Sequence, residues 1–236
     1  MKTIGLLGGM SWESTVLYYQ TINRIVCERL GGLRSAPLLL YSFDFQEVEE
    51  LQRSGQWSRA GELLTRFAQV LETAGAELLV LCTNTMHRVA PQLEAGLSIE
   101  FLHIADATAD RISAAGIRRV GLLGTRFTME QAFYRGRLEE QHGLEVIIPS
   151  EPHRMSVHRI IYEELCRGRV LEASRSAYRR IASELIDRGC EGIILGCTEI
   201  GSLLRPSDVD APLFDTARIH AEAAALHALG IDVAHS

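Results

Sequence analysis

The sequence is nearly devoid of lysine: Lys2 is the single lysine among 236 residues. Enzymes that use pyridoxal phosphate need a lysine to form a Schiff base, and a P-loop needs one to hold its phosphates. Lys2 stands directly before the first predicted strand, where neither kind of site could be built. Both classes are therefore excluded.

Basic residues, long apolar runs and closely spaced cysteines are also scarce. A net charge of −6 argues against a nucleic-acid partner, because a phosphate-binding face normally carries a basic excess. No apolar run approaches the roughly 20 residues that span a bilayer, so we expect no membrane contact. The sequence opens on a strand pattern rather than a signal peptide, and its five cysteines have no CxxC spacing. These features predict a cytoplasmic protein with free thiols.

Short apolar strands alternate with helical stretches along the whole chain, the pattern of a parallel α/β sheet. A first set of strands is predicted at Thr3–Leu7, Leu38–Ser42, Leu78–Leu81 and Phe101–His103. A second set is predicted at Val120–Leu123, Glu145–Ile148, Gly192–Leu195 and Leu213–Phe214.

Three helices are predicted with particular signals. The helix Trp12–Leu30 has an apolar face of Val16, Tyr19, Ile22, Val26 and Leu30, and Ser58–Thr73 has one of Leu63, Leu64, Phe67, Val70 and Leu71. Thr128 is predicted to begin a long helix through a capping box. The last helix, Thr216–Leu229, is expected to pack back on the first domain.

The two strand sets resemble each other. The segment from Gly75 to Asn84 aligns without gaps on that from Gly189 to Thr198, at a constant offset of 114 residues. We therefore predict two similar α/β domains with mainly parallel sheets, related by an internal repeat, with the active site in the cleft between them. The first domain is predicted to comprise 1–98 and 214–236, and the second 99–213.

Three loops at predicted strand ends could bind a ligand, because helix N-termini there offer free N–H groups. The first is Gly8-Gly9-Met10-Ser11, which alone is more often just a tight turn. The other two are Cys82-Thr83-Asn84-Thr85-Met86-His87 and Gly196-Cys197-Thr198-Glu199-Ile200. Both place hydroxyl, amide or thiol groups at equivalent points of the repeat.

A buried cysteine is more often a packing residue than a catalytic one. We interpret Cys27, Cys166 and Cys190 in that way, whereas the polar cluster after Cys197 makes that thiol a candidate catalyst. A zinc site would have to use Cys82, His87, Cys197 and His220, whose spacing matches no zinc pattern, so no metal is expected. His220 and His227 are expected to cap the last helix or line its surface.

At these loops the sequence resembles the aspartate/glutamate racemase family, and the likeness runs over essentially the whole chain. The matching segments are Gly8–Ser11, Asn84–His87, Leu122–Thr125, Gly196–Glu199, Phe214–Ala217 and Ile219–Ala221. The resemblance implies a homodimer that acts on a small amino-acid substrate without any cofactor. It also implies two acid/base groups, one on each face of the substrate α-carbon.

The first motif departs from the family pattern Cys-Asn-Thr-x-His, because Thr83 directly precedes Asn84 and the cysteine lies one place back at Cys82. The repeat alignment also pairs Thr83 with Cys197. Neighbouring side chains of a strand point to opposite faces, so we predict Thr83 and Cys197 as the catalytic pair and Cys82 as a core residue. The pattern resembles the subgroup of L-aspartate/glutamate racemases that keeps a Thr and a Cys.

The resemblance implies that Cys197 deprotonates the L-substrate and that Thr83 returns a proton from the other face. A nearby helix N-terminus is expected to lower the pKa of Cys197 below its usual value. Substrate contacts are expected from Met10, Ser11, Asn84, Thr85, Thr198 and Glu199. Relatives carry a lysine at the position of Cys166, and Gln52 and Arg53 are the candidates to replace that contact.

Three other functions remain open. The chain could be a racemase of broader amino-acid specificity, or a related isomerase or decarboxylase that uses the same cysteine. It could also be an amino-acid-binding protein without catalysis. A cysteine-dependent hydrolase is disfavoured, because no histidine is placed predictably beside Cys197.

Overall fold

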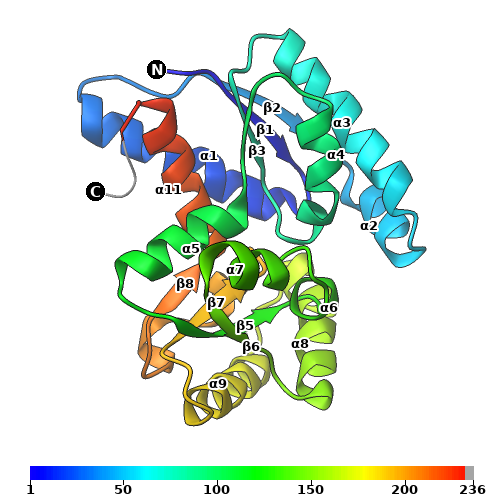
Figure 1. Cartoon of the computed structure of the whole chain (residues 1–236), viewed down its shortest axis with the longest axis vertical. Helices are drawn as coiled ribbons and strands as arrows, with labels where there is room; N and C mark the ends of the chain where they lie inside the picture. Colours follow the sequence, from blue (N-terminus) through cyan, green and yellow to red (C-terminus); the bar gives the residue numbers. More distant parts are fainter. Residues whose placement is uncertain (232–236) are drawn as a thin grey trace. The chain divides into compact units, whose positions relative to one another are not determined.

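The computed structural model describes residues 1–231. Its contacts divide the chain into two compact units: Met1–Ala107 with the chain from His220 onward, and Thr108–Ile219. Two helices connect them, since α5 (Ile104–Ala114) begins in the first unit and ends in the second, and α11 (Thr216–Ala228) runs in the opposite sense. Each unit is an α/β layer structure around its own parallel sheet (Figure 1).

The first sheet has the order β2-β1-β3-β4, with all neighbours parallel. Its strands are β1 (Ile4–Gly8), β2 (Leu38–Ser42), β3 (Leu78–Leu81) and β4 (Glu100–Leu102). The helices α1 (Trp12–Leu30) and α11 lie on one face of this sheet. The other face is covered by α2 (Phe45–Arg53), α3 (Trp57–Thr73), the 3₁₀ helix η1 (Thr85–Val89) and α4 (Ala90–Ala95).

The second sheet has the order β6-β5-β7-β8, again all parallel. Its strands are β5 (Arg119–Gly124), β6 (Glu145–Ile147), β7 (Gly192–Gly196) and β8 (Leu213–Asp215). The helices of this unit are α6 (Arg126–Glu130), α7 (Arg135–His142), α8 (Glu151–Glu163), α9 (Glu172–Asp187) and α10 (Ile200–Leu203). Two 3₁₀ helices, η2 (Leu165–Arg167) and η3 (Pro206–Asp208), lie in its loops.

The internal repeat is visible in the strand register. Ile4 of β1 pairs with Leu78 of β3, and Val120 of β5 pairs with Gly192 of β7. In both sheets the strand that comes first in the chain lies between the second and the third strand. The two units therefore share a strand topology as well as the sequence repeat. The α/β class and the eight predicted strands are confirmed, each to within one residue at either end.

The predicted domain boundaries differ from the contact grouping. β4 pairs with β3 in the first sheet, whereas the predicted range 99–213 places it in the second domain. β8 pairs with β7 in the second sheet, whereas the predicted boundary after residue 213 cuts this strand and places Phe214 and Asp215 in the first domain. The difference arises because the chain passes between the units within α5 and α11. Each of these helices begins only after the strand before it has been completed, so that strand stays in the unit the chain is leaving. Residues 232–236 of the predicted first domain lie outside the described residues.

Two helix predictions are wrong in detail. α1 buries Tyr18, Ile22 and Val26, while Val16 and Tyr19 are exposed. Its sequence carries two apolar stripes, and the one that includes Thr15 packs on the sheet, where a Cβ at Gly8 would meet the Thr15 side chain.

The helix expected to start at Thr128 instead begins as α6, with Thr125 as its N-cap. The Thr125 hydroxyl accepts a hydrogen bond from the Thr128 amide at 3.3 Å, three residues earlier than the predicted cap. The helix stops at Glu130, and α7 follows as a separate element.

Candidate active site

The predicted acid/base residues follow equivalent strands. Leu78 and Gly192 hold the same register position in their sheets, and Thr83 and Cys197 each lie five residues further along the chain. Thr83 follows β3 and Cys197 follows β7, both at the carboxyl end of an inner strand. Open parallel sheets bind their ligands at this end of the strands.

The first loop begins directly after Leu81, the residue at which the strand was predicted to end. β3 ends at Leu81, and the Thr83 amide turns back to donate to the Leu81 carbonyl at 2.8 Å. Strict strand alternation therefore does not separate Cys82 from Thr83, contrary to the expectation from sequence. Cys82 is nevertheless fully buried, and burial raises the pKa of its thiol far above the usual range. Such a thiol stays protonated and packs as a small apolar side chain.

The polar residues after Thr83 are all buried. Asn84 and Thr85 lead into η1, whose next residue, Met86, is also buried. Gln52 on α2 is 4% exposed, and its side-chain amide lies 3.0 Å from the Met86 sulfur. The structure therefore brings Gln52 beside the Thr83 loop. Arg53 is different: its exposed guanidinium pairs with Glu49 at 3.6 Å.

The glycine loop after β1 is a tight strand–helix turn. Gly9 has a φ of +87°, and the Thr15 hydroxyl accepts from its amide at 2.8 Å. Thr15 in turn donates to the Ser11 carbonyl, while Ser11 caps α1 through its side chain. Met10 and Ser11 are both buried. The Gly9 amide is thus used within the turn.

The second loop holds a thiol against a carboxylate. The Cys197 thiol donates to Glu199 Oε2 at 2.9 Å, and the Thr198 hydroxyl donates to the same oxygen at 2.8 Å. All three residues are 7–8% exposed. From the sequence, Glu199 was expected to contact the substrate, and its hydrogen bond with the Cys197 thiol was not predicted. The three consecutive polar residues Cys197, Thr198 and Glu199 are the sequence feature from which this contact could have been predicted.

The expected lowering of the Cys197 pKa is wrong. Burial, followed by the charge of Glu199, raises the pKa of this thiol well above its usual value. The helix after the loop, α10, has four residues, so little of a helix dipole acts on the sulfur. A backbone hydrogen bond at Glu199 lowers the pKa, but it is the smallest contribution. Cys197 therefore rests as a thiol beside a proton acceptor.

A buried tyrosine lies close to this thiol. Tyr178 of α9 is fully buried and donates to the Val157 carbonyl at 3.2 Å. Burial raises the pKa of Tyr178 well above its usual value, and electrostatic interactions with the ionisable groups of Cys197, Cys166, Glu164 and Glu199 add to this effect. Sequence reasoning missed Tyr178, whose place in an amphipathic helix resembles that of any core aromatic.

The other cysteines and the last histidines follow the predictions only in part. Cys190 is buried and Cys166 is partly buried, but Cys27 is exposed, because it lies on the solvent side of α1. His220 is fully buried rather than on the surface, whereas His227 contacts Glu100 at the surface. Among residues 1–231, no group of three or more His, Cys, Asp or Glu side chains is arranged to hold a metal ion.

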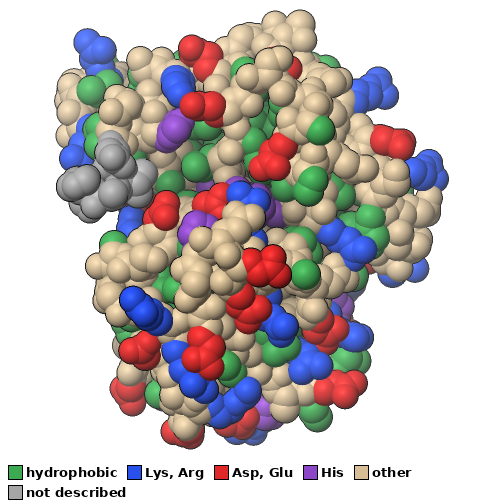
Figure 2. All heavy atoms as spheres, in the orientation of Figure 1, with side chains coloured by type: hydrophobic (Ala, Val, Ile, Leu, Met, Phe, Trp, Pro, Cys, Tyr) green, Lys and Arg blue, Asp and Glu red, His purple; other side chains and the backbone are tan. Residues whose placement is uncertain are grey.

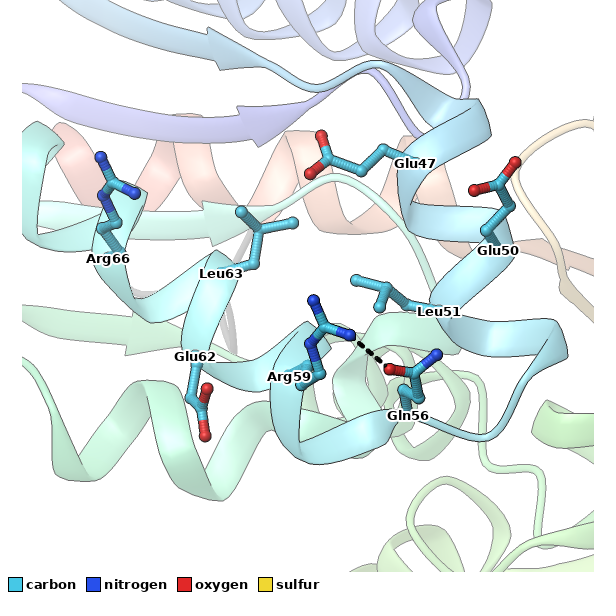
Figure 3. A pocket seen from close by; sticks show the side chains of 8 residues that line it. All are labelled: Glu47, Glu50, Leu51, Gln56, Arg59, Glu62, Leu63 and Arg66. Atoms are coloured by element: carbon cyan, nitrogen blue, oxygen red, sulfur yellow. Dashed lines mark hydrogen bonds between the residues drawn. The ribbon is translucent and has the colours of Figure 1, made fainter.

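A surface hollow of about 450 Å³ lies between α2 and α3, away from the predicted loops (Figure 3). Its charged side chains are three glutamates and two arginines, and Arg59 donates to Gln56 at 2.7 Å. None of the predicted site residues lines it. It also lacks a thiol or imidazole, so the loop after β3 in the first unit and the loop after β7 in the second remain the candidate functional loops.

On the face shown in Figure 2, acidic and basic side chains are interspersed, and neither sign of charge forms a patch of its own. Within the described chain, no helix combines the length and the apolar character needed to cross a membrane.

Comparisons with known proteins identify the family of this chain. The family model described as Asp/Glu/Hydantoin racemase matches residues 7–224. A crystal structure from Yersinia pestis, provisionally described as an Asp/Glu racemase, is 57% identical, with a TM-score of 0.91 over 97% of this chain and 100% of that one. An aspartate racemase homologue from Pyrococcus horikoshii is 36% identical, with a TM-score of 0.83 over 97% and 100%.

A curated relative, the broad specificity amino-acid racemase RacX of Bacillus subtilis, is 23% identical over 90% of this chain and 92% of its own length. The family match covers most of the sequence and includes both candidate loops. The chain therefore belongs to the Asp/Glu/hydantoin racemase family.

Proposed function

We propose that the protein is a cofactor-independent racemase that interconverts L- and D-aspartate or glutamate, with Cys197 and Thr83 as its acid/base pair. The observation that carries this proposal is the hydrogen bond from the Cys197 thiol to Glu199. A thiol that rests protonated beside a carboxylate has an acceptor for its proton when a substrate arrives. The equivalent position of the repeat, Thr83, supplies a hydroxyl.

In the forward direction Glu199 Oε2 takes the thiol proton, and the Cys197 sulfur takes the α-proton of the L-amino acid. The electron pair of the broken C–H bond passes to the α-carbon and its carboxylate. The Thr83 hydroxyl then gives its proton to the opposite face, and its oxygen recovers a proton from water. The protonated Glu199 returns its proton to the hydroxide so formed, which restores the starting state of the enzyme. Each group acts as a general acid or base at one face of the α-carbon.

The two faces are chemically unequal. A hydroxyl can donate to a strongly basic carbanion, but it is a poor base because its pKa lies far above that of a thiol. The enantiomers have equal free energy in water, so kcat/KM must be the same in both directions. A weak Thr83 therefore slows the overall reaction or changes kcat and KM together in the D-to-L direction.

A second candidate is a racemase of broader amino-acid specificity. One observation favours it: the Arg53 guanidinium is exposed and pairs with Glu49. The family resemblance adds that Cys166 stands where relatives carry a lysine. Gln52, beside Met86, would then supply a neutral contact to the substrate side chain. The similarity to RacX agrees with this candidate. Comparable rates for several neutral amino acids, with none higher for aspartate or glutamate, would select it.

The test is exchange of the α-proton in D₂O, followed by NMR together with chiral analysis of the product, with no pyridoxal phosphate or metal added. Cys197→Ser should abolish both exchange and racemisation, whereas the matched control Cys190→Ser should keep both. Thr83→Ala should keep exchange of the L-substrate proton while cutting formation of the D-product. Full activity in Cys197→Ser, or activity that needs zinc after dialysis against a chelator, would refute the proposal.

The same assay decides between the two residues of the first loop. Cys82→Ala should leave both rates largely intact and cost about 1 kcal/mol or more of stability through lost packing. If Cys82→Ala instead stops exchange in a protein that remains folded by circular dichroism, Cys82 rather than Thr83 is the partner of Cys197.

A further inference from the structure

We propose that His87 is a positioning residue for Thr83: its ring N–H holds the Thr83 carbonyl and so fixes the backbone that carries the reactive hydroxyl. This inference rests on the proposed role of Thr83. Its basis is a contact between two buried residues of the same loop, in which His87 Nδ1 lies 2.7 Å from the Thr83 carbonyl oxygen.

The partners of the ring settle which nitrogen carries the proton. The Ile104 amide donates to His87 Nε2 at 3.2 Å, so Nε2 must be the unprotonated nitrogen. The proton of the neutral ring is then on Nδ1, where it can donate to the Thr83 carbonyl. The imidazole therefore links the Thr83 loop to the first residue of α5. A proton added at Nε2 would face the Ile104 N–H and break this arrangement.

Neighbouring rings hold His87 in place. It is 1% exposed, and its ring centroid lies 4.5 Å from that of His103, 5.6 Å from that of Phe101 and 5.9 Å from that of His220. His220 is itself fixed at both nitrogens, by Tyr18 at 2.9 Å and by the Leu102 carbonyl at 3.0 Å. A ring with so little freedom can define the position of the group that it binds.

Both backbone polar groups of Thr83 are consequently held. Its amide donates to the Leu81 carbonyl, and its carbonyl accepts from His87. Loss of the second bond leaves a carbonyl in a largely buried loop to seek another partner, which shifts the backbone. A shift of about 1 Å in a reacting group can cost on the order of 100-fold in rate. This loss of rate should affect the protonation by Thr83 that forms the D-product, and not the removal of the L-substrate α-proton by Cys197.

The experiment compares two rates in D₂O for each variant: α-proton exchange from L-aspartate, which reports Cys197, and D-aspartate formation, which reports Thr83. His87→Gln puts its amide near the Nε2 position and loses the Nδ1 donor, so D-aspartate formation should fall at least about 10-fold while L-exchange changes less than about 2-fold. His87→Asn puts an N–H near the Nδ1 position and should recover most of the loss. The control His220→Gln disturbs the same ring cluster without touching Thr83, and should leave the ratio of the rates unchanged.

The double variant Thr83→Ala/His87→Gln should form no less D-product than Thr83→Ala alone, because a positioning residue acts only through its partner. Equal loss of both rates in His87→Gln, or loss of neither, would overturn the role of His87. If Thr83→Ala fails to separate the two rates, the proposed acid/base pair itself is wrong. ¹⁵N NMR of the wild-type imidazole gives an answer without any variant: a neutral Nδ1–H tautomer is expected, and an Nε2–H tautomer would contradict the inference.

Discussion

At the scale of single residues, the unexpected partner of Cys197 is the Glu199 carboxylate. It raises the pKa of the thiol, after burial, and it also accepts the thiol proton. These two effects oppose each other in a mutant. In Glu199→Gln the thiol should ionise at lower pH than in the wild type, yet exchange of the L-substrate proton should fall by about 10- to 100-fold because the internal base is lost.

Thiolate absorbance at about 240 nm, followed against pH in variants whose only cysteine is Cys197, measures the first effect, and NMR exchange measures the second. Glu164→Gln is the matched control, since Glu164 is a buried carboxylate of the same unit that binds Ser174. A faster rate in Glu199→Gln would mean that Glu199 only suppresses the thiolate and does not act as a base.

The motifs predicted which residue types come together, but not their ionisation. Cys197 and Thr83 could be placed at equivalent strand ends because the repeat has no gaps. The pKa of Cys197 could not be predicted, since burial dominates it and the burial of a loop residue depends on how segments distant in sequence pack around it. The link between His87 and Ile104 was hidden for the same reason.

At the scale of elements, strands were predicted better than helix faces. The inner strands are buried on both sides and read as short apolar runs, so their positions are unambiguous. α1 offers two apolar stripes, and only the close approach of Thr15 to Gly8 decides which one packs on the sheet. The end of β3 at Leu81 was predicted, but the turn at Thr83 was not, because it is a backbone hydrogen bond with no sequence signal.

The turn between β1 and α1 leads to a prediction for Gly9. Its φ is +87°, and a Cβ built there would lie 2.3 Å from the Phe43 carbonyl oxygen. Gly9→Ala therefore combines an unfavourable backbone conformation with a clash against backbone, and should lower the free energy of unfolding by about 3 kcal/mol or more. Urea unfolding followed by circular dichroism measures the change.

Gly55→Ala separates the two causes. Gly55 has a φ of +70°, but no atom lies within 4 Å of the position that a Cβ would take there. This variant should lose only the conformational part, about 1 kcal/mol. Equal losses at Gly9 and Gly55 would show that the contact with Phe43 yields easily and that the turn is not tightly packed.

At the scale of the whole molecule, one arrangement of strands is used twice. The two sheets share strand order and register, and each has its candidate residue after the third strand of its unit. The repeat could be read from the sequence, but the exchange of chain between the units could not. α5 and α11 look like ordinary helices that follow a strand, and only their contacts show that each runs from one unit into the other.

His220 makes the stability of the protein depend on pH. Burial lowers its pKa from 6.5 to about 4, with smaller opposing effects from Leu102 and Asp106. As the pH falls below about 6.5 the unfolded chain takes up a proton at this histidine, whereas the folded chain does so only near pH 4. The free energy of unfolding should therefore fall across that window, by about 3 kcal/mol for this group, and no further below it.

Urea unfolding at about pH 7 and about pH 4.5 tests this expectation. His220→Gln should be less stable than the wild type near neutral pH, because Tyr18 and the Leu102 carbonyl lose their well-placed partner. It should nevertheless lose less stability between the two pH values, since glutamine does not titrate. His142→Gln, at a partly exposed histidine that ends α7, should retain the wild-type dependence. Parallel losses in His220→Gln and the wild type would mean that His220 is not held neutral in the folded protein, and that other groups cause the acid sensitivity.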